Sequence, residues 1–226
     1  IYGTCPYKSP TDMGVNMVGN CIIDDEACCE ASKQEIIRRY YTCLNQYVQG
    51  DASEDEVANI ELLMQQAKIT TDYRAVTQAA KARAEKAKVP TAAIELADGT
   101  IITSETTPLL GTSAALLLNA TKHLAGIDHK VKLIPKEMIE PIQQMKVNLL
   151  SGNNPRLHTD EVLVALAMLS KDDENCKKAL EQLANLKGCQ VHTSVMLSEV
   201  DRKIFKKLGV DLTCEPVYKK QKPLIG

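Results

Sequence analysis

Apolar positions at helical spacing dominate the first part of the chain. One such stripe predicts a helix over about residues 28–48 and consists of Ile36, Ile37, Tyr40, Leu44 and Tyr47. Ser53 carries a side chain that caps helix starts, so a second helix is predicted after it. A third helix is predicted over about residues 71–88, with basic residues towards its end, as the helix dipole favours. These patterns indicate a helical segment over residues 28–89.

The pattern changes to short β-type runs after Pro90. Residues 91–96 and 100–103 flank Asp98–Gly99, a pair that supplies the positive φ angles of a tight hairpin turn. Further on, residues 189–197 alternate between two kinds of side chain, which predicts a strand with two distinct faces. We therefore expect a hairpin early in this region and another strand near its end.

A β-α-β unit is predicted at the end of the folded region. Ser198–Asp201 resembles a capping box and opens a helix that runs to Leu208, and residues 210–214 form the next strand. So short a crossover requires parallel pairing, with the helix on one face of the sheet. Between the hairpin and this unit, the pattern predicts a strand at 131–134 and helices that start at Pro135, Thr159 and Asp172.

The stretch Ser104–Asn119, SETTPLLGTSAALLLN, joins hydroxyl side chains to a helix that is apolar on almost every face. Such a helix, over about residues 112–125, belongs in the interior of a fold. We expect its free N–H groups at Gly111, Thr112 and Ser113 to point into a buried or half-buried place. The start of a buried helix is a ready site for an anion.

These elements predict a mixed α/β fold, in which a helical segment precedes a small mixed or parallel sheet covered by helices. The expected organisation is a connector over residues 1–27, the helical segment 28–89, an α/β domain 90–216 and a tail 217–226. The chain starts in a loop-like stretch and without Met, so we expect residues 1–27 to continue a missing N-terminal domain.

Composition excludes several classes of protein. Of the 226 residues, 44% are apolar and 25% charged, with a net charge of -2, which is ordinary for a globular protein and gives no reason to expect nucleic acid as a partner. No apolar run approaches the length of a membrane-spanning helix. The eight cysteines contain no C-x-x-C pair, so we expect reduced thiols, a cytoplasmic protein and no metal site.

The candidate ligand-binding residues surround the start of the 112–125 helix. Backbone N–H groups and hydroxyls there suit phosphate or carboxylate, although plain capping of a core helix explains the same pattern. Asn119 is polar within an apolar helix, so it either contacts a ligand or binds backbone. The candidates are Thr106, Thr107, Gly111, Thr112, Ser113, Asn119 and, from a later loop, Arg156.

The run Asn154–Glu161, NPRLHTDE, places an arginine, a histidine and two carboxylates around a helix start. Arg156 can form a fork on a carboxylate or phosphate, and His158 can move protons near neutral pH. His158 is therefore the best candidate for a catalytic residue. The alternative is a helix start behind an exposed basic loop.

A third pair, His192 and Ser194, lies two positions apart on one strand face. Contact between a serine and a histidine can activate a nucleophile, but this spacing alone does not establish it. The alternative is satisfied polar packing.

Five long runs of the sequence are similar to the C-terminal half of a known family. They are YGTCPYKSPTDMGVNMVGNC, KQEIIRRYY, LLGTSAALLLNATKHLAGI, NPRLHTDEVLVAL and LGVDLTCEP. The chain resembles in these runs the uncharacterised bacterial family known as UPF0371 or DUF1846. The resemblance implies a protein about twice as long, with an α/β nucleotide-binding-like half before this region, and it supplies no activity or catalytic residue.

Two functions remain open, and the sequence does not decide whether the protein is an enzyme or which cofactor it uses. The first is part of a larger enzyme that binds a small anionic metabolite between the 104–113 and 154–161 segments. Its expected partners are the small anion, the missing N-terminal half of the same protein and a second copy in a homo-oligomer. The second is a non-catalytic assembly module that uses the helical segment to dimerise or to dock the rest of the chain.

Overall fold

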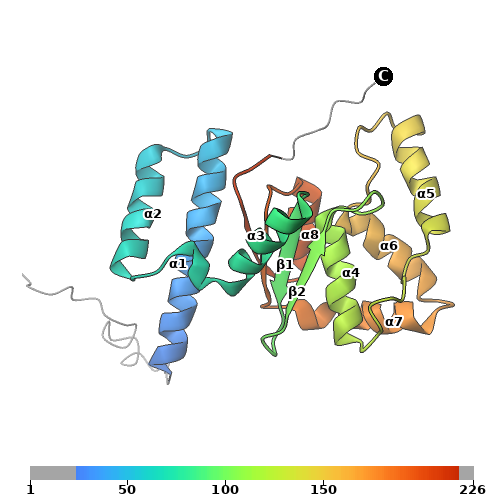
Figure 1. The fold of residues 1–226 in the computed structure, drawn as a ribbon, viewed down its shortest axis with the longest axis horizontal. Helices are drawn as coiled ribbons and strands as arrows, with labels where there is room; N and C mark the ends of the chain where they lie inside the picture. The colour runs from blue at the N-terminus through green and yellow to red at the C-terminus, as the bar shows by residue number, and fades with distance from the viewer. Residues whose placement is uncertain (1–23, 219–226) are drawn as a thin grey trace, which may run out of the picture. The chain divides into compact units, whose positions relative to one another are not determined.

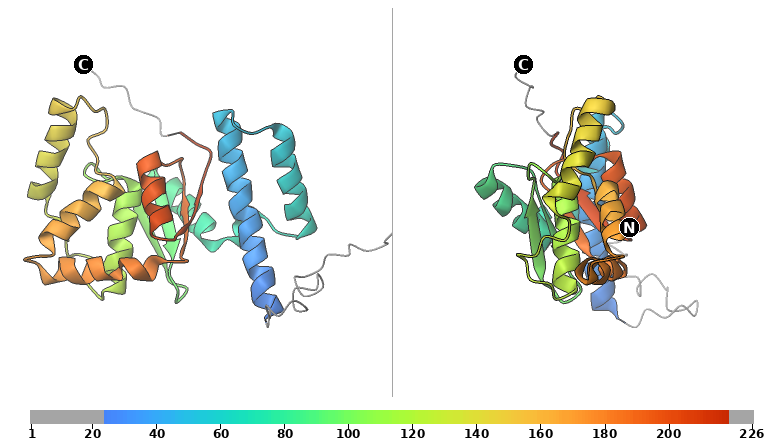
Figure 2. Two further views of the ribbon diagram at one scale, coloured as in Figure 1. Left: turned by 180° about the vertical axis from the view of Figure 1, so that it is seen from behind. Right: turned by 90° about the vertical axis from the view of Figure 1, so that its right-hand side faces the viewer.

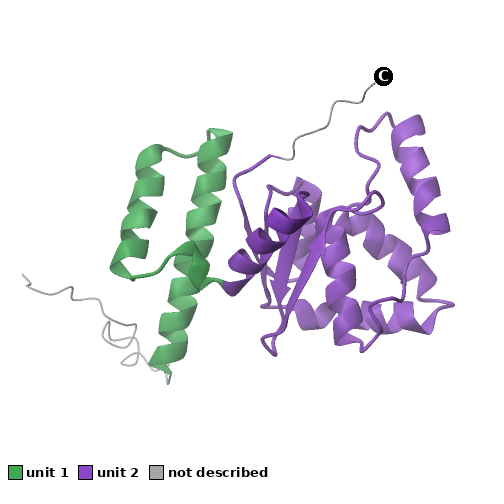
Figure 3. Ribbon diagram, in the orientation of Figure 1, with its two compact units in different colours: residues 1–74 green, residues 75–226 purple. Residues whose placement is uncertain are grey.

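The computed structural model describes residues 24–218, so the connector predicted over residues 1–27 and the predicted tail lie largely outside the described residues (Figure 1). The chain divides into two compact units, residues 1–74 and 75–226, which are coloured separately in Figure 3. The domain boundary expected at residues 89 and 90 stays a prediction.

The first unit is a pair of helices, α1 (Asp25–Gln49) and α2 (Glu54–Gln66), followed by a short 3-10 turn at Thr71–Tyr73. The start of α2 is a capping box, in which Ser53 and Glu56 satisfy each other's backbone N–H groups, so the predicted Ser53 cap is confirmed. The two helices share a small apolar core formed by Ile37, Tyr41, Met64 and Ile69.

The second unit contains the sheet and six helices among its described residues. Its helices are α3 (Ala75–Ala87), α4 (Thr112–Leu124), α5 (Lys136–Gln144), α6 (Thr159–Leu169), α7 (Glu174–Glu181) and α8 (Glu199–Lys207). Short turns of other helix types follow α5 at Met145–Leu149 and α7 at Gln182–Leu186. The strands are β1 (Thr91–Glu95), β2 (Ile101–Glu105), β3 (Gln190–Thr193) and β4 (Asp211–Cys214).

The four strands form one mixed sheet in the order β2-β1-β3-β4. β1 pairs antiparallel with both β2 and β3, whereas β3 pairs parallel with β4. The predicted hairpin, the parallel β-α-β unit and the mixed α/β fold class are thus confirmed. Gly99, with a φ of 82°, supplies the left-handed conformation that the hairpin turn requires.

The two faces of the sheet carry separate apolar clusters, because side chains alternate along a strand. Ala93 packs with Val76 and Ala80 of α3 on one face. Ala92 and Ile94 point to the opposite face, and the apolar cluster there includes members from α4 and α8, among them Leu116, Leu117 and Phe205. The sheet therefore lies between α3 on one face and α4 and α8 on the other (Figure 2). Nine of the thirteen residues of α4 are buried, as its apolar composition predicts.

Three local predictions need correction. Residues 131–134 form no strand: Val131 N donates to Asp128 O in a turn, and Leu133 and Ile134 are buried in a second apolar cluster. The helix predicted over 71–88 is interrupted at Arg74, whose backbone is extended, and α3 begins after it. The strand predicted over 189–197 ends at Thr193. Within residues 24–218, no helix has both the length and the apolar character needed to cross a membrane.

Candidate functional site

The two segments singled out in the sequence lie side by side in the second unit. Leu110 and Leu157 form an isolated parallel bridge. Its hydrogen bonds run from Leu157 N to Leu109 O and from Gly111 N to Leu157 O, both at 3.0 Å. A Cβ atom on Gly111 would lie 3.4 Å from Leu157 O, which shows how closely the two backbones approach. The 104–113 and 154–161 segments are therefore physically joined.

Arg156 and His158 flank Leu157, which is fully buried. Arg156 Nε donates to Thr107 O at 2.8 Å. Its two Nη groups form no hydrogen bond or ion pair with any residue of the described part, and the side chain is only half-buried. The guanidinium can accordingly bind an anion through its outer edge.

His158 is held by residues on both sides of its imidazole ring. Nδ1 lies 3.1 Å from Asp201 Oδ2, and Nε2 lies 3.2 Å from Asn154 Nδ2. The side chain of His158 keeps 25% of its surface exposed, whereas that of Asp201 keeps 5%. A partly accessible imidazole beside a buried carboxylate is an arrangement suited to proton transfer.

Asp201 joins the first turns of two helices. Its Oδ1 accepts from the backbone N and the hydroxyl of Thr159, both at 3.0 Å, which satisfies the start of α6. Its Oδ2 accepts from Ser198 Oγ at 2.8 Å, and the Asp201 N–H donates back to Ser198 Oγ at the start of α8. Burial opposes ionisation of this carboxyl, but the hydrogen bonds from His158, Thr159 and Ser198 outweigh it and lower the pKa of Asp201 below its usual value.

Ser198 is not placed as a nucleophile activated by His158. In a hydroxyl–imidazole–carboxylate triad, the hydroxyl and the carboxylate occupy opposite ring nitrogens. Here Ser198 Oγ and Asp201 Oδ2 both face Nδ1, at 3.4 and 3.1 Å. Ser198 instead caps α8, which confirms the predicted capping box in its Ser198-to-Asp201 half.

The α6 start differs from the prediction in one residue, because His158 rather than Thr159 occupies the cap position. The His158 backbone N–H donates to Glu161 Oε2 at 2.8 Å. Lys146 Nζ forms an ion pair with the same Glu161 oxygen at 2.7 Å and donates to Arg156 O at 2.7 Å. These contacts hold the loop before α6 against the helix, so the backbone on each side of Arg156 and His158 is fixed.

The α4 start is more occupied than the sequence indicates. The Gly111 N–H, expected to be free, donates to Leu157 O. Ser104 Oγ contacts the carbonyl and the hydroxyl of Thr112 at 2.8 and 3.1 Å, and Ser113 is 2% exposed. Asn119 Nδ2 donates to Thr103 O at 3.3 Å, so it binds backbone. The hydroxyls of Ser104 and Thr112 therefore have structural partners.

The side-chain hydroxyls of Thr106 and Thr107 differ in their hydrogen-bond partners. Thr107 Oγ1 accepts from Leu110 N at 3.0 Å and so shapes the loop. The buried Thr106 Oγ1 has no hydrogen-bond partner within the part of the chain that the structure describes. Buried hydroxyls are rarely left without one. The ligand-binding role assigned to Thr106, Thr107, Gly111, Thr112, Ser113, Asn119 and Arg156 stays a prediction.

His192 forms a second buried polar cluster, on the α3 side of the unit. Its Nδ1 lies 2.9 Å from Thr213 Oγ1 and its Nε2 lies 3.2 Å from Glu215 Oε1, while Lys81 forms an ion pair with Glu215 at 3.0 Å. This order matches a triad, but His192 is 0% and Thr213 3% exposed, so a substrate does not reach the hydroxyl. Ser194 Oγ accepts from the backbone N–H of Thr91. The interpretation as polar packing fits these contacts.

Burial makes Glu215 harder to ionise, but His192 and Lys81 outweigh this effect and lower the pKa of Glu215 to about 2. The carboxylate is therefore ionised at neutral pH and links β4 to both β3 and α3.

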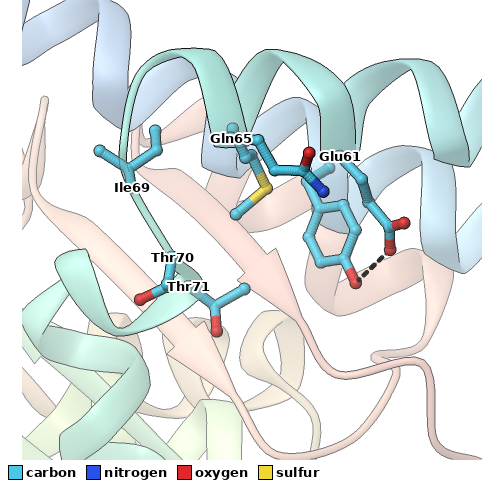
Figure 4. A pocket seen from close by; sticks show the side chains of 7 residues that line it. Glu61, Gln65, Ile69, Thr70 and Thr71 are labelled. Carbon is cyan, nitrogen blue, oxygen red and sulfur yellow. Dashed lines mark hydrogen bonds between the residues drawn. The ribbon is translucent and has the colours of Figure 1, made fainter.

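Other features of the described residues add no stronger site. An open depression of about 290 Å³ in the first unit is lined by Tyr40, Glu61, Met64, Gln65, Ile69, Thr70 and Thr71 (Figure 4). Tyr40 Oη and Glu61 Oε1 meet there at 3.4 Å. Between residues 24 and 218, no three His, Cys, Asp or Glu side chains gather as a metal site would require. All six cysteines in that range are free thiols.

The fold and the site together define a mixed α/β protein in which a partly exposed histidine contacts a buried aspartate where two segments join. The C-terminal and N-terminal models of a domain of unknown function, DUF1846, match residues 72–223 and 1–68. The chain belongs to this family.

Its relatives carry the name UPF0371. One from Corynebacterium urealyticum is 52% identical over 218 residues, which cover 96% of this chain and 44% of the relative. One from Streptococcus pyogenes is 47% identical over 222 residues, which cover 98% and 45%. The chain thus spans less than half the length of these relatives.

The matches correct one predicted partner and the extent of the resemblance. The N-terminal family model matches residues 1–68, so the similarity is not confined to the C-terminal domain. The prediction that a missing N-terminal half of the same protein is a partner is wrong, because both family models match within this chain and the relatives align with 96–98% of it.

Sequence reasoning identified His158 and Arg156 but not Asp201 or Lys146. The only local signal for Asp201 was its place in the capping box of α8, which says nothing about a contact 43 residues away. Lys146 follows a helix without any distinguishing pattern. The contacts of Asp201 and Lys146 with the candidate site can be recognised only in the folded structure.

Proposed function

We propose that the second unit forms part of an enzyme site for a small anionic metabolite, with His158 as the general base. The site lies where the 104–113 and 154–161 segments join. One observation carries the proposal: the partly exposed imidazole of His158 is oriented by buried Asp201, two residues from a guanidinium whose outer edge is available. Orientation by a carboxylate is how proteins direct a histidine towards proton transfer.

The anionic class follows from the charges around the site. Arg156, two residues before His158, offers two Nη groups, and a guanidinium forms a fork on carboxylate or phosphate. Glu161 and Asp201, the nearby carboxylates, are already paired with Lys146 and His158. Thr106 adds a hydroxyl without a partner among residues 24–218. An anion would satisfy the outer edge of Arg156.

Thermal unfolding in the presence of phosphate or a small dicarboxylate tests the proposal. We expect the midpoint of the intact chain to rise more with these anions than with chloride at equal ionic strength. Arg156→Gln should weaken the apparent affinity by roughly 10- to 100-fold, which corresponds to a charged hydrogen-bonded pair worth about 1.5–3 kcal/mol.

Arg202→Gln is the matched control, because Arg202 is exposed on α8 and lies outside the joined segments. This variant should respond to the anions as the wild type does. Equal responses from wild type, Arg156→Gln and Arg202→Gln would show that Arg156 binds no anion.

A non-catalytic assembly module is the second candidate. Its support comes from exposed apolar side chains on the first unit, Tyr47 at 44%, Leu62 at 52% and Leu63 at 48%. Apolar side chains gathered on a surface mark interaction sites. Sedimentation velocity of the wild type and of Leu62→Glu tests this second candidate function. A concentration-dependent oligomer in the wild type that is absent in the variant supports assembly. A monomer in both cases rejects it.

A further inference from the structure

We infer that Asp201 and Asn154 are positioning residues that hold His158 in the neutral tautomer with its hydrogen on Nδ1, which makes Nε2 the basic nitrogen. The inference deepens the proposed function by naming the atom that takes the proton. It rests on that function only for the claim that a substrate meets His158, because the tautomer itself follows from contacts within the chain.

Only acceptors face the Nδ1 side of the ring. The Asp201 carboxylate carries no hydrogen when it is ionised. Ser198 uses its one hydroxyl hydrogen on Asp201 Oδ2 at 2.8 Å, so towards Nδ1, 3.4 Å away, its oxygen is an acceptor. With two acceptors and no donor on this side, Nδ1 completes its hydrogen bond only if it carries the hydrogen.

A donor faces the Nε2 side. The two ends of an asparagine amide are assigned from their partners, and Asn154 has one at each end. Its Oδ1 accepts from the Arg156 backbone N–H at 3.3 Å, which turns Nδ2 towards His158 Nε2 at 3.2 Å. The amide donates there, so Nε2 presents its lone pair. Both sides of the ring therefore lead independently to the same tautomer.

Proton uptake at Nε2 changes this arrangement in a defined way. A protonated Nε2 is a donor and faces the Asn154 amide hydrogens, so the amide must rotate or leave and give up the Arg156 N–H. When a substrate X–H replaces the amide, the X–H bond breaks, the proton forms an N–H bond at Nε2, and the bonding electrons stay on X. The resulting imidazolium keeps its Nδ1–H on Asp201, which stabilises the charge.

Nitrogen-15 NMR of the imidazole rings in the intact chain tests the tautomer directly. At a pH where His158 is neutral, we expect Nδ1 to have the nitrogen-15 chemical shift of a protonated ring nitrogen. Nε2 should have the chemical shift of an unprotonated ring nitrogen. The His158→Gln variant assigns the signals, because it lacks only those of His158. A wild-type spectrum with the hydrogen on Nε2 would overturn the inference, whatever the variants show.

Asp201→Asn is the decisive substitution, with Ser198→Ala as its matched control. The asparagine keeps one oxygen for Thr159 but turns an NH2 group towards Nδ1, so donors then face both ring nitrogens and the preference for Nδ1–H should be lost. Ser198→Ala removes the α8 cap and one contact with Asp201, but it leaves Asp201 as the acceptor, so Nδ1–H should persist. Loss of the Nδ1–H preference in both variants, or in neither, contradicts a positioning role for Asp201.

These results separate the inference from the proposed function. The tautomer is measured without ligand, so its determination does not depend on the anion site. If phosphate has no effect, the proposed anion site is rejected but the inferred tautomer is not. Conversely, an Nε2–H tautomer together with specific anion binding would overturn the inference and keep the site.

Discussion

At the scale of single residues, a buried and a half-buried carboxylate contribute to how the second unit responds to acid. Glu215 and Asp201 are each held by several donors, and each has a pKa below its usual value. A carboxyl whose pKa is lower in the folded than in the unfolded chain stabilises the fold above its unfolded pKa. That contribution is lost as the pH falls towards the folded pKa.

The Glu215→Gln variant should lose less stability in acid than the wild type. The pKa of Glu215 falls from 4.5 to about 2 on folding, so its contribution is complete above pH 4.5 and disappears as the pH falls to about 2. The contribution amounts to at most roughly 3 kcal/mol. Urea titrations between these pH values measure it, with Lys81→Gln as a second variant that breaks the same cluster. Parallel acid profiles for Glu215→Gln and wild type would contradict the account.

The cysteines differ in reactivity because of burial. Cys28 and Cys29 on α1 are partly exposed, whereas Cys176 and Cys214 are buried and burial raises the pKa of both thiols. Since the thiolate is the reactive form, iodoacetamide should label Cys28 and Cys29 before Cys176 and Cys214 in the native protein. Peptide mapping over time measures the order, and early labelling of Cys176 would contradict the described core.

Local sequence patterns identify only part of the candidate site. Arg156 and His158 stand in a polar run at a helix start, and that local pattern was enough to select them. Their partners come from elsewhere: Asp201 is 43 residues from His158, and Thr107 is 49 residues from Arg156. No periodicity carries information about such pairs. The free N–H expected at Gly111 was wrong for the same reason, since its acceptor is Leu157 O.

At the scale of elements, the loop between α5 and α6 depends on a close backbone contact. Gly152 N donates to Lys146 O at 2.8 Å, and a Cβ atom on Gly152 would lie 2.9 Å from that oxygen. Lys146 in turn holds Glu161 and the Arg156 carbonyl. The start of the candidate site is therefore sensitive to a single methyl group at position 152.

Gly152→Ala should destabilise the second unit by about 1–3 kcal/mol, because the backbone of Lys146 must shift to admit the methyl group. Gly111→Ala is the matched control: its Cβ would meet Leu157 O at 3.4 Å, an ordinary contact, so we expect a loss of about 0.5 kcal/mol or less. Thermal unfolding followed by circular dichroism compares the two. The opposite ranking would show that the loop is not held as described.

Elements with strong periodicity were predicted well, and short apolar runs were not. The hairpin and the β-α-β unit follow from alternation and turn residues, and α4 follows from its length and apolar character. The strand predicted over residues 131–134 is wrong, because a short run with three apolar residues fits a strand and a buried turn equally well. The structure buries Leu133 and Ile134 without any partner strand.

At the scale of the whole molecule, each unit has its own core. The cluster around Ile37 and Tyr41 lies within residues 1–74, and the three other clusters lie within residues 75–226. A unit with its own core and complete sheet can fold independently. The candidate site needs residues of the second unit only.

A chain of residues 75–218 should therefore unfold cooperatively on its own. Its NMR spectrum should retain the His158 and His192 ring signals of the full chain, because Asn154, Asp201, Thr213 and Glu215, which contact the two rings, lie in this range. A collapsed spectrum with poorly dispersed signals would show that the first unit is required for the second to fold.

The most direct test of the account is an NMR titration of the full chain with phosphate, observed at the Arg156 Nε–H and the His158 ring. We expect both sets of signals to move together and to saturate, with chloride at equal ionic strength having no comparable effect. Such a result would place an anion beside the oriented histidine. Movement of neither set, or equal movement with chloride, would contradict an anion site at the junction of the two loops.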